Sequence, residues 1–280
     1  MKSSKPIFPS GHFYSPIVDT AELSSKDAAF WDGSMLPGVD LNDPSQVKLL
    51  DVITRWMPQF DYPVTQDETG TLGYFLANDQ FTWLDVRALF AFMCEWRPSR
   101  VIEVGSGFST AIMLDVRRKF LGEQTAITCI EPYPRPVLQH ALESGGATLL
   151  QQKVQELDAG FFDVLEPGDI LFIDSSHVVK TGSDCCFLYL EVLPRLKPGV
   201  RIHVHDIFLP AEYPRRWVIE ENRSWNEQYI LQALLAHSHG FKVLFGSAYV
   251  AMAHHDLAAA AVAPLPDYGV GGGSFWIERS

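Results

Sequence analysis

Four side chains that follow two consecutive predicted strands are the residues of this sequence best suited to acid–base or metal chemistry. Asp174 comes directly after the apolar run Ile-Leu-Phe-Ile, and His177 follows three positions later. Further along the chain, the run Arg-Ile-His-Val ends in His205 and Asp206. In open α/β sheets the ligand lies outside the carboxyl ends of the strands. We therefore expect one cluster that holds a divalent cation or supplies a general base. The alternative is that Asp174 caps the next turn and Asp206 is a solvated acid.

A second group of candidates surrounds a glycine turn that begins at Glu103. Apolar residues from Val101 to Val104 predict a strand buried on both faces, and Gly105 and Gly107 let the backbone turn sharply and approach a ligand. A loop that grips a pyrophosphate carries a further glycine, which is missing here, and it has no acid beside the turn. We therefore expect a ligand with hydroxyl groups and a cationic centre.

Glu131 ends the next predicted strand. An acid about 20 residues past a glycine turn accepts hydrogen bonds from both hydroxyls of a ribose. The spacing of Glu131 from the turn fits this use. A solvated acid at the end of a strand is the alternative.

Short apolar strands alternate with helices over most of the chain, which predicts an α/β fold with a doubly wound, mainly parallel, seven-stranded sheet. The predicted strands are 101–104, 126–130, 148–152, 170–173, 202–204, 241–245 and 274–279. The predicted helices are 45–57, 82–96 (opened by a capping box from Thr82 to Asp85), 110–119, 136–144, 184–193 and 225–237. Residues 257–262 form a short helix or a loop. We expect residues 1–80 to be a helical extension that covers the core, and residues 81–280 to be a single globular unit.

Composition narrows the range of partners. The formal net charge of −12 over 280 residues would repel nucleic acid and anionic membranes, so we expect neither as a partner. No apolar run suits a signal peptide or a membrane span, and the four cysteines lack metal-site spacing, which fits a cytoplasmic protein. A small-molecule partner is the expectation. The oligomeric state stays open, a homodimer included.

With these features the sequence resembles the class I S-adenosylmethionine-dependent methyltransferases, in particular the branch that contains macrolide-sugar O-methyltransferases. The turn from Glu103 to Gly107 resembles the family's first motif, which binds the methionine part of the cofactor, and Glu131 matches the acid that holds the ribose. The resemblance is specific from Arg100 to about Pro210. It implies a Rossmann-like methyltransferase fold. The implied S-adenosylmethionine-binding residues are Glu103, Gly105, Ser106, Gly107, Ser109, Glu131, Gln155 and Asp174.

The stretch from Phe172 to His177 resembles the motif in which sugar-modifying members use the aspartate as a magnesium ligand and the histidine as a base. By position, this implies that Asp174 and His177 are the catalytic residues. Asp206 matches a second metal-ligating acid, but His205 stands where those members carry a glutamate. Imidazole suits softer divalent ions than magnesium. The resemblance therefore implies a metal site of Asp174, His205 and Asp206 for magnesium or another divalent ion, with a metal-free site that uses His177 alone as the alternative.

The implied reaction is methyl transfer to a small-molecule acceptor at a hydroxyl oxygen. His177 would act as general base while Asp174 and Asp206 position the acceptor or an ion. A nicotinamide-dependent oxidoreductase is an alternative that shares the strand, the turn and the ribose acid, but it needs a third glycine near position 110, where this chain has Ser-Thr-Ala. A second alternative is an inactive cofactor-binding module, which should lack the polar cluster.

Two segments are candidates for a cover over the acceptor. Residues 209–217 follow the fifth predicted strand and could fold over the site as a lid, and His12, Phe13 and Tyr14 could close it from the N-terminal side. Ordinary surface or packing roles are the alternatives for both segments. The identity of the acceptor does not follow from the sequence.

Overall fold

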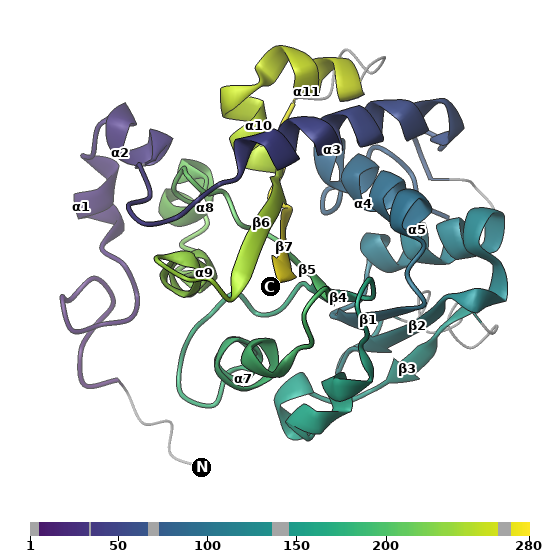
Figure 1. Ribbon diagram of the computed structural model, residues 1–280. Helices are drawn as coiled ribbons and strands as arrows, with labels where there is room; N and C mark the ends of the chain where they lie inside the picture. The colour runs from purple at the N-terminus through teal and green to yellow at the C-terminus, as the bar shows by residue number, and fades with distance from the viewer. Residues whose placement is uncertain (1–5, 34, 67–72, 136–145, 263–269) are drawn as a thin grey trace.

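The computed structural model describes residues 6–33, 35–66, 73–135, 146–262 and 270–280. Within them, seven strands form one sheet in the order β3-β2-β1-β4-β5-β7-β6 (Figure 1). The strands are β1 Arg100–Val104, β2 Ala126–Ile130, β3 Thr148–Leu150, β4 Ile170–Ile173, β5 Arg201–Val204, β6 Phe241–Gly246 and β7 Phe275–Arg279. Strand β7 runs antiparallel to both β5 and β6, and the other neighbouring strands pair in parallel. The prediction of a mainly parallel seven-stranded α/β sheet is confirmed.

The helices are α1 Thr20–Ser24, α2 Ala28–Asp32, α3 Asp43–Trp56, α4 Trp83–Trp96, α5 Phe108–Val116, α7 Asp184–Phe187, α8 Arg215–Ile219, α9 Glu227–Leu235, α10 Ser247–Ala253 and α11 His255–Val262. Helices α3, α4, α5, α7 and α9 lie at predicted places with differences at their ends, whereas α1, α2, α8 and α10 were not predicted as separate helices. A π-helical turn continues α5 to Leu121, and a π-helical turn followed by a 3₁₀ turn continues α7 to Arg195. Residues 257–262, which the sequence left as helix or loop, belong to α11. The predicted helix 136–144 lies outside the described residues.

Helices cover both faces of the sheet, as the near-continuous apolar strands require. Figure 1 shows α3, α4, α5 and α11 on one side and α7 and α9 on the other. Each side has its own cluster of buried side chains. The carboxyl ends of the parallel strands are therefore left as the edge at which a ligand can reach the sheet.

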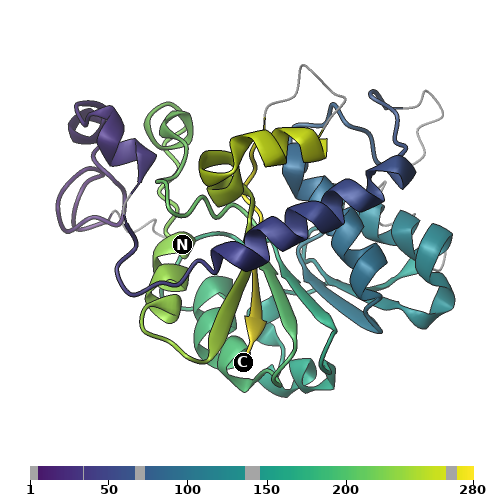
Figure 2. The ribbon, with the colours of Figure 1, turned by 45° about the horizontal axis from the view of Figure 1, so that its top comes forward.

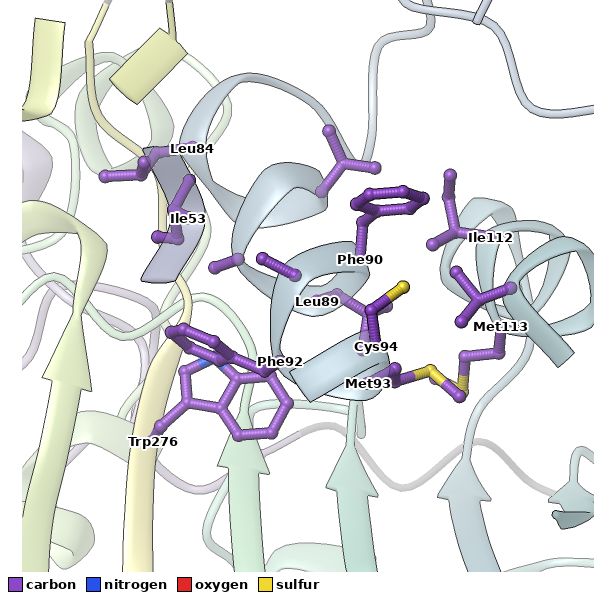
Figure 3. Close-up of a cluster of buried hydrophobic side chains, with 14 of the residues drawn as sticks. Ile53, Leu84, Leu89, Phe90, Phe92, Met93, Cys94, Ile112, Met113 and Trp276 are labelled. Atoms are coloured by element: carbon purple, nitrogen blue, oxygen red, sulfur yellow. The ribbon is translucent and has the colours of Figure 1, made fainter. Parts of the chain in front are cut away.

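Helix α4 is apolar nearly all round because other elements enclose it. Eleven of its residues are buried, and Figure 3 shows Phe90, Met93 and Cys94 facing Ile112 and Met113 of α5. On another side of α4, Phe92 contacts the Trp276 ring of β7 at a centroid distance of 5.3 Å. This packing fixes the position of the start of α4, where Asp85 lies.

The predicted capping box at the start of α4 is wrong. Thr82 makes no side-chain capping hydrogen bond. The Asp85 carboxylate instead accepts the backbone N–H groups of Gly273 and Ser274, each at 2.9 Å. A carboxylate accepts hydrogen bonds from backbone N–H groups of another segment as readily as from those of its own helix. The tertiary fold decides which of these N–H groups lie close enough. Asp85 thereby ties the glycine-rich segment before β7 to α4.

The N-terminal extension packs on the core at two places. Helix α3 contributes Leu49, Leu50 and Ile53 to the same buried cluster as α4. Helices α1 and α2 lie beside the segment that follows β5, as Figure 2 shows for α1, α2 and α8. Among the described residues, no helix has the length and apolar character needed to cross a membrane.

Candidate active site

The glycine turn after β1 has the predicted form of strand, turn and helix. Gly105 has φ +97°, and a Cβ there would lie 2.5 Å from the carbonyl oxygen of Asp174. Only glycine suits a left-handed residue with a backbone so close. The N–H of Gly107 donates to the Thr110 hydroxyl at 3.0 Å, which starts α5. The turn of β1 and the end of β4 are thus packed directly on each other.

Glu103 stands behind this turn and supports it. Its side chain is fully buried, and the hydroxyls of Ser109 and Thr110 donate to its two carboxylate oxygens at 2.6 Å each. Burial raises the pKa of Glu103 to about 7, although these hydrogen bonds and one from Cys129 oppose the shift. Neither Glu103 nor Ser109 lines the pocket described below. Their direct contact with a cofactor therefore stays a prediction.

A pocket of about 510 Å³ opens beside the turn at the carboxyl ends of the strands. Four of the predicted cofactor-binding residues line it: Gly105, Glu131, Gln155 and Asp174. The Glu131 carboxylate accepts the N–H of Tyr133 at 2.7 Å, which holds it at the end of β2. Ser106 and Gly107 are partly exposed in the turn next to this pocket. The structure thus brings the turn, the ribose acid and Asp174 around one cavity.

The polar residues at the ends of β4 and β5 form one cluster, as predicted. Nε2 of His177 lies 3.3 Å from Oδ1 of Asp174 and 3.5 Å from Oδ2 of Asp206. Nε2 of His205 lies 3.5 Å from Oδ1 of Asp206. The cluster forms because β4 and β5 are neighbours in register, with Ile173 opposite Val204. His203 lies two residues before His205 on β5. It is fully buried and forms a hydrogen bond with the Ser274 hydroxyl at 2.9 Å, so it belongs to the core.

Glu227 is a member of this cluster that the sequence did not indicate. It begins α9, is fully buried, and its Oε2 lies 2.8 Å from Nδ1 of His177. The sequence places Asn226 and Glu227 at the start of a predicted helix near the same end of the sheet, with ordinary helix capping as the alternative to a role in the site. No spacing in the sequence indicates that Glu227 contacts His177.

The carboxylates around His177 stabilise its charged form. Burial lowers the pKa of His177, but its hydrogen bonds with Asp174 and Glu227 outweigh burial and raise the pKa to about 10. The pKa of Asp174 is lowered: burial opposes the shift, and the hydrogen bond with His177 and the charge of His205 produce it. These contacts therefore favour the imidazolium form of His177.

The predicted metal site does not fit this arrangement. Among the residues that the structure describes, no group of three or more His, Cys, Asp or Glu side chains is disposed to hold a metal ion. Nε2 of His177 instead lies 3.3 Å from Asp174 and 3.5 Å from Asp206, so an imidazole contacts both carboxylates. A divalent ion on Asp174, His205 and Asp206 is therefore not supported.

A second, smaller cavity of about 310 Å³ lies next to the cluster. Its walls are mainly apolar and aromatic, and they include Trp31 of α2, Phe208, Tyr213 and Gly272. Phe208 follows Asp206 by two residues, and Gly272 precedes Gly273, whose Cβ position would lie 2.8 Å from the Asp206 Cα. Part of the predicted lid, residues 209–217, thus borders a cavity beside the cluster.

The N-terminal aromatic residues do not line either cavity. Phe13 and Tyr14 are exposed, and with His12 they stack on one another. The extension is nevertheless anchored near the cluster, because the Val18 N–H donates to the Ser224 hydroxyl at 3.3 Å. Whether His12, Phe13 and Tyr14 close over an acceptor stays a prediction.

The fold is Rossmann-like, with a pocket at the carboxyl ends of the strands beside a cluster of acids and histidines. Residues 102–207 match the model of a methyltransferase domain family. A relative from Archaeoglobus fulgidus, described as an uncharacterized protein, is 41% identical over 165 residues, which are 57% of this chain and 74% of the relative. The chain belongs to this family and is a class I S-adenosylmethionine-dependent methyltransferase.

Solved structures of two methyltransferases are similar to this chain. An O-methyltransferase from Bacillus cereus in complex with SAH is 12% identical, with 83% of this chain and 91% of that chain covered and a TM-score of 0.43. A methyltransferase from Geobacter sulfurreducens is 17% identical, with 88% of this chain and 93% of that chain covered and a TM-score of 0.41.

Proposed function

We propose that this enzyme methylates a hydroxyl oxygen of a small, uncharged acceptor, with His177 as general base and Asp174 and Asp206 positioning the acceptor. One observation carries the proposal: a single imidazole nitrogen faces two carboxylates at the edge of the cofactor pocket. A neutral hydroxyl is a weak nucleophile, so a positioned base is what transfer to oxygen requires.

The pocket residues suit S-adenosylmethionine. Glu131 would accept hydrogen bonds from the ribose hydroxyls, Gly105 allows close approach of the methionine part, and Gln155 would contact the adenine. Asp174 is partly exposed to the pocket and provides an anion for a cationic centre. When bound, S-adenosylmethionine supplies the methyl group on a positively charged sulfur.

The charges of the cluster explain how His177 becomes a base. A positive charge beside Asp174 competes with the imidazolium for that carboxylate and lowers the pKa of His177, so the ring can release its proton. The acceptor oxygen then forms a bond to the methyl carbon with a lone pair, the sulfur keeps its former bonding pair, and Nε2 of His177 takes the hydroxyl proton. Asp174 and Asp206 stabilise the imidazolium that forms.

The apolar cavity beside Asp206 is the place we propose for the body of the acceptor. Trp31, Phe208 and Tyr213 give it aromatic walls, and Glu212 and Arg215 are charged residues of its lining. Apolar and aromatic walls with few polar groups are typical of small-molecule sites. Sugars and other hydroxylated molecules with an apolar face would suit such a cavity. The acceptors of the macrolide-sugar O-methyltransferases, which the sequence resembles, are molecules of this kind.

The proposal is tested by identifying the methylated atom. The enzyme is incubated with S-adenosylmethionine labelled with ¹³C at the methyl group and with a small-molecule extract, and products are resolved by carbon NMR. We expect new signals at chemical shifts of O-methyl groups, which are absent when the unlabelled NAD cofactor replaces S-adenosylmethionine. Signals only from N-methyl or C-methyl groups would contradict the proposal.

A further inference from the structure

Three consecutive residues at the start of α9 hold His177 from different directions. The Trp225 ring lies against the imidazole at a centroid distance of 4.4 Å. The Asn226 N–H donates to the His177 carbonyl at 3.0 Å, and the Asn226 side chain accepts the Val179 N–H at 2.6 Å. Glu227 contacts Nδ1 at 2.8 Å. The ring, the backbone and one ring nitrogen of His177 are thus all fixed by α9 and the residues before it.

The Glu227 carboxylate is used on both of its oxygens. Oε2 faces Nδ1 of His177, and Oε1 accepts the Ser175 hydroxyl at 3.2 Å. Burying a carboxylate is costly unless it is paired and hydrogen-bonded. Glu227 is fully buried, and its hydrogen bonds with His177 and Ser175 satisfy that condition. Its placement therefore makes physical sense as a partner of this imidazole.

Carboxylates face both ring nitrogens of His177, and the contact of Nδ1 with Glu227 at 2.8 Å is shorter than those of Nε2 with Asp174 and Asp206 at 3.3 and 3.5 Å. Because an ionised carboxylate only accepts hydrogen bonds, the shorter contact favours Nδ1 as the nitrogen that keeps the proton when the ring is neutral. Nε2 is then the nitrogen with a free lone pair when the ring is neutral, and it is the nitrogen that faces Asp174 and Asp206. The arrangement directs the basic lone pair toward the reacting hydroxyl.

We propose that Glu227 is a positioning residue that fixes the tautomer and orientation of His177. The inference rests on the proposed role of His177 as base, and it extends that site by a residue that does not touch the acceptor. Glu227 acts through His177: without it, either nitrogen can carry the proton and the ring is free to turn away from the acceptor.

The decisive experiment compares Glu227→Gln, Glu227→Asp and the control Glu191→Gln, all as full-length chains. Glu191 is exposed and lines neither cavity, so its substitution removes a carboxylate without affecting the imidazole. Proteins labelled with ¹⁵N in the histidine rings report the tautomer of each ring, and the His177 signals are assigned by their loss in His177→Asn. Calorimetric titration with S-adenosylmethionine measures cofactor binding in the same samples.

The expected result is a neutral-ring pattern with the proton on Nδ1 of His177 in the wild type with S-adenosylmethionine and in Glu191→Gln. In Glu227→Gln this pattern is lost, cofactor affinity is unchanged, and transfer to the acceptor found by methyl labelling slows by about 10²- to 10⁴-fold. Glu227→Asp keeps the carboxylate and restores part of the rate. A purely structural role would change cofactor affinity and rate together, without rescue by aspartate.

An unchanged His177 ring pattern in Glu227→Gln would overturn the inference. This failure is distinguishable from failure of the proposed function. If the proposed function were wrong, His177→Asn would leave methyl transfer intact, whatever the ring pattern of the Glu227 variants.

Discussion

Nε2 of His177 lies 3.5 Å from Oδ2 of Asp206, and both residues have a left-handed backbone, with φ 58° and 55°. Such conformations cost non-glycine residues about 1–3 kcal/mol each and persist where the surroundings enforce them. Here the Asn226 N–H holds the His177 carbonyl, and the Ile207 N–H donates to the Gly273 carbonyl at 2.8 Å. The fold thus accepts strain at the two residues whose side chains we assign to the reaction.

Replacing Gly105 by alanine should damage the enzyme at the turn. A Cβ there would lie 2.5 Å from the Asp174 carbonyl and would sit on a left-handed residue. We expect the free energy of unfolding to fall by about 1–3 kcal/mol or more, and S-adenosylmethionine affinity to weaken. Gly107→Ala is the matched control, because Gly107 has extended φ and no atom within 4 Å of the added carbon. Equal stability of the two variants in urea unfolding would refute this interpretation.

The sequence predicted most of the site because strand ends are a local signal. Apolar runs that stop at Asp174 and Asp206, and the turn at Gly105, require only the known geometry of parallel sheets to come together. The structure confirms that juxtaposition.

Two other features depended on contacts between distant segments. Glu227 lies 50 residues from His177 in the chain and reaches it only through the docking of α9. Asp85, predicted as a capping residue, binds Gly273 and Ser274, which are almost 190 residues away. Neither pairing has a periodicity or spacing that a single sequence reveals.

The ionisation of Glu103 should make stability depend on pH. Its pKa is about 7 in the folded enzyme against 4.5 for an ordinary glutamate, mainly because of burial. The folded state therefore holds a proton that the unfolded state has lost between these values, so stability is greatest below pH 4.5 for this group and falls as pH rises to 7. The loss amounts to about 3 kcal/mol.

Urea unfolding of Glu103→Gln between pH 5 and 8 checks this effect, since glutamine does not titrate. We expect a smaller decline of stability with pH than in the wild type. The exposed Glu191→Gln variant should retain the wild-type decline. The same slope in all three proteins would show that Glu103 ionises normally.

Removal of divalent ions should leave activity unchanged. Nε2 of His177 lies 3.3 Å from Asp174 and 3.5 Å from Asp206, so the imidazole already contacts the two carboxylates that an ion would bind. Methyl transfer is measured after dialysis against EDTA and again after addition of Mg²⁺, Mn²⁺ or Zn²⁺. Loss of activity on chelation, with recovery by one of these ions, would contradict the metal-free site.

Cofactor binding should release protons from His177. The pKa of about 10 keeps the ring protonated at pH 8 in the free enzyme, and a cation beside Asp174 lowers that pKa. S-adenosylmethionine is cationic at sulfur, and S-adenosylhomocysteine is not. We therefore expect greater proton release with the former, measured by calorimetry in two buffers of different ionisation enthalpy. His177→Asn should abolish the difference between the two ligands, and equal release in the wild type would argue against this coupling.

The rate of methyl transfer by His177→Ala, measured together with its affinity for S-adenosylmethionine, addresses the role of the imidazole most directly. We predict wild-type affinity and a rate reduced by about 10²- to 10⁴-fold. His254→Ala, which removes a histidine paired with Asp43 on α3, should behave as the wild type. Transfer by His177→Ala at the wild-type rate would show that another group takes the proton.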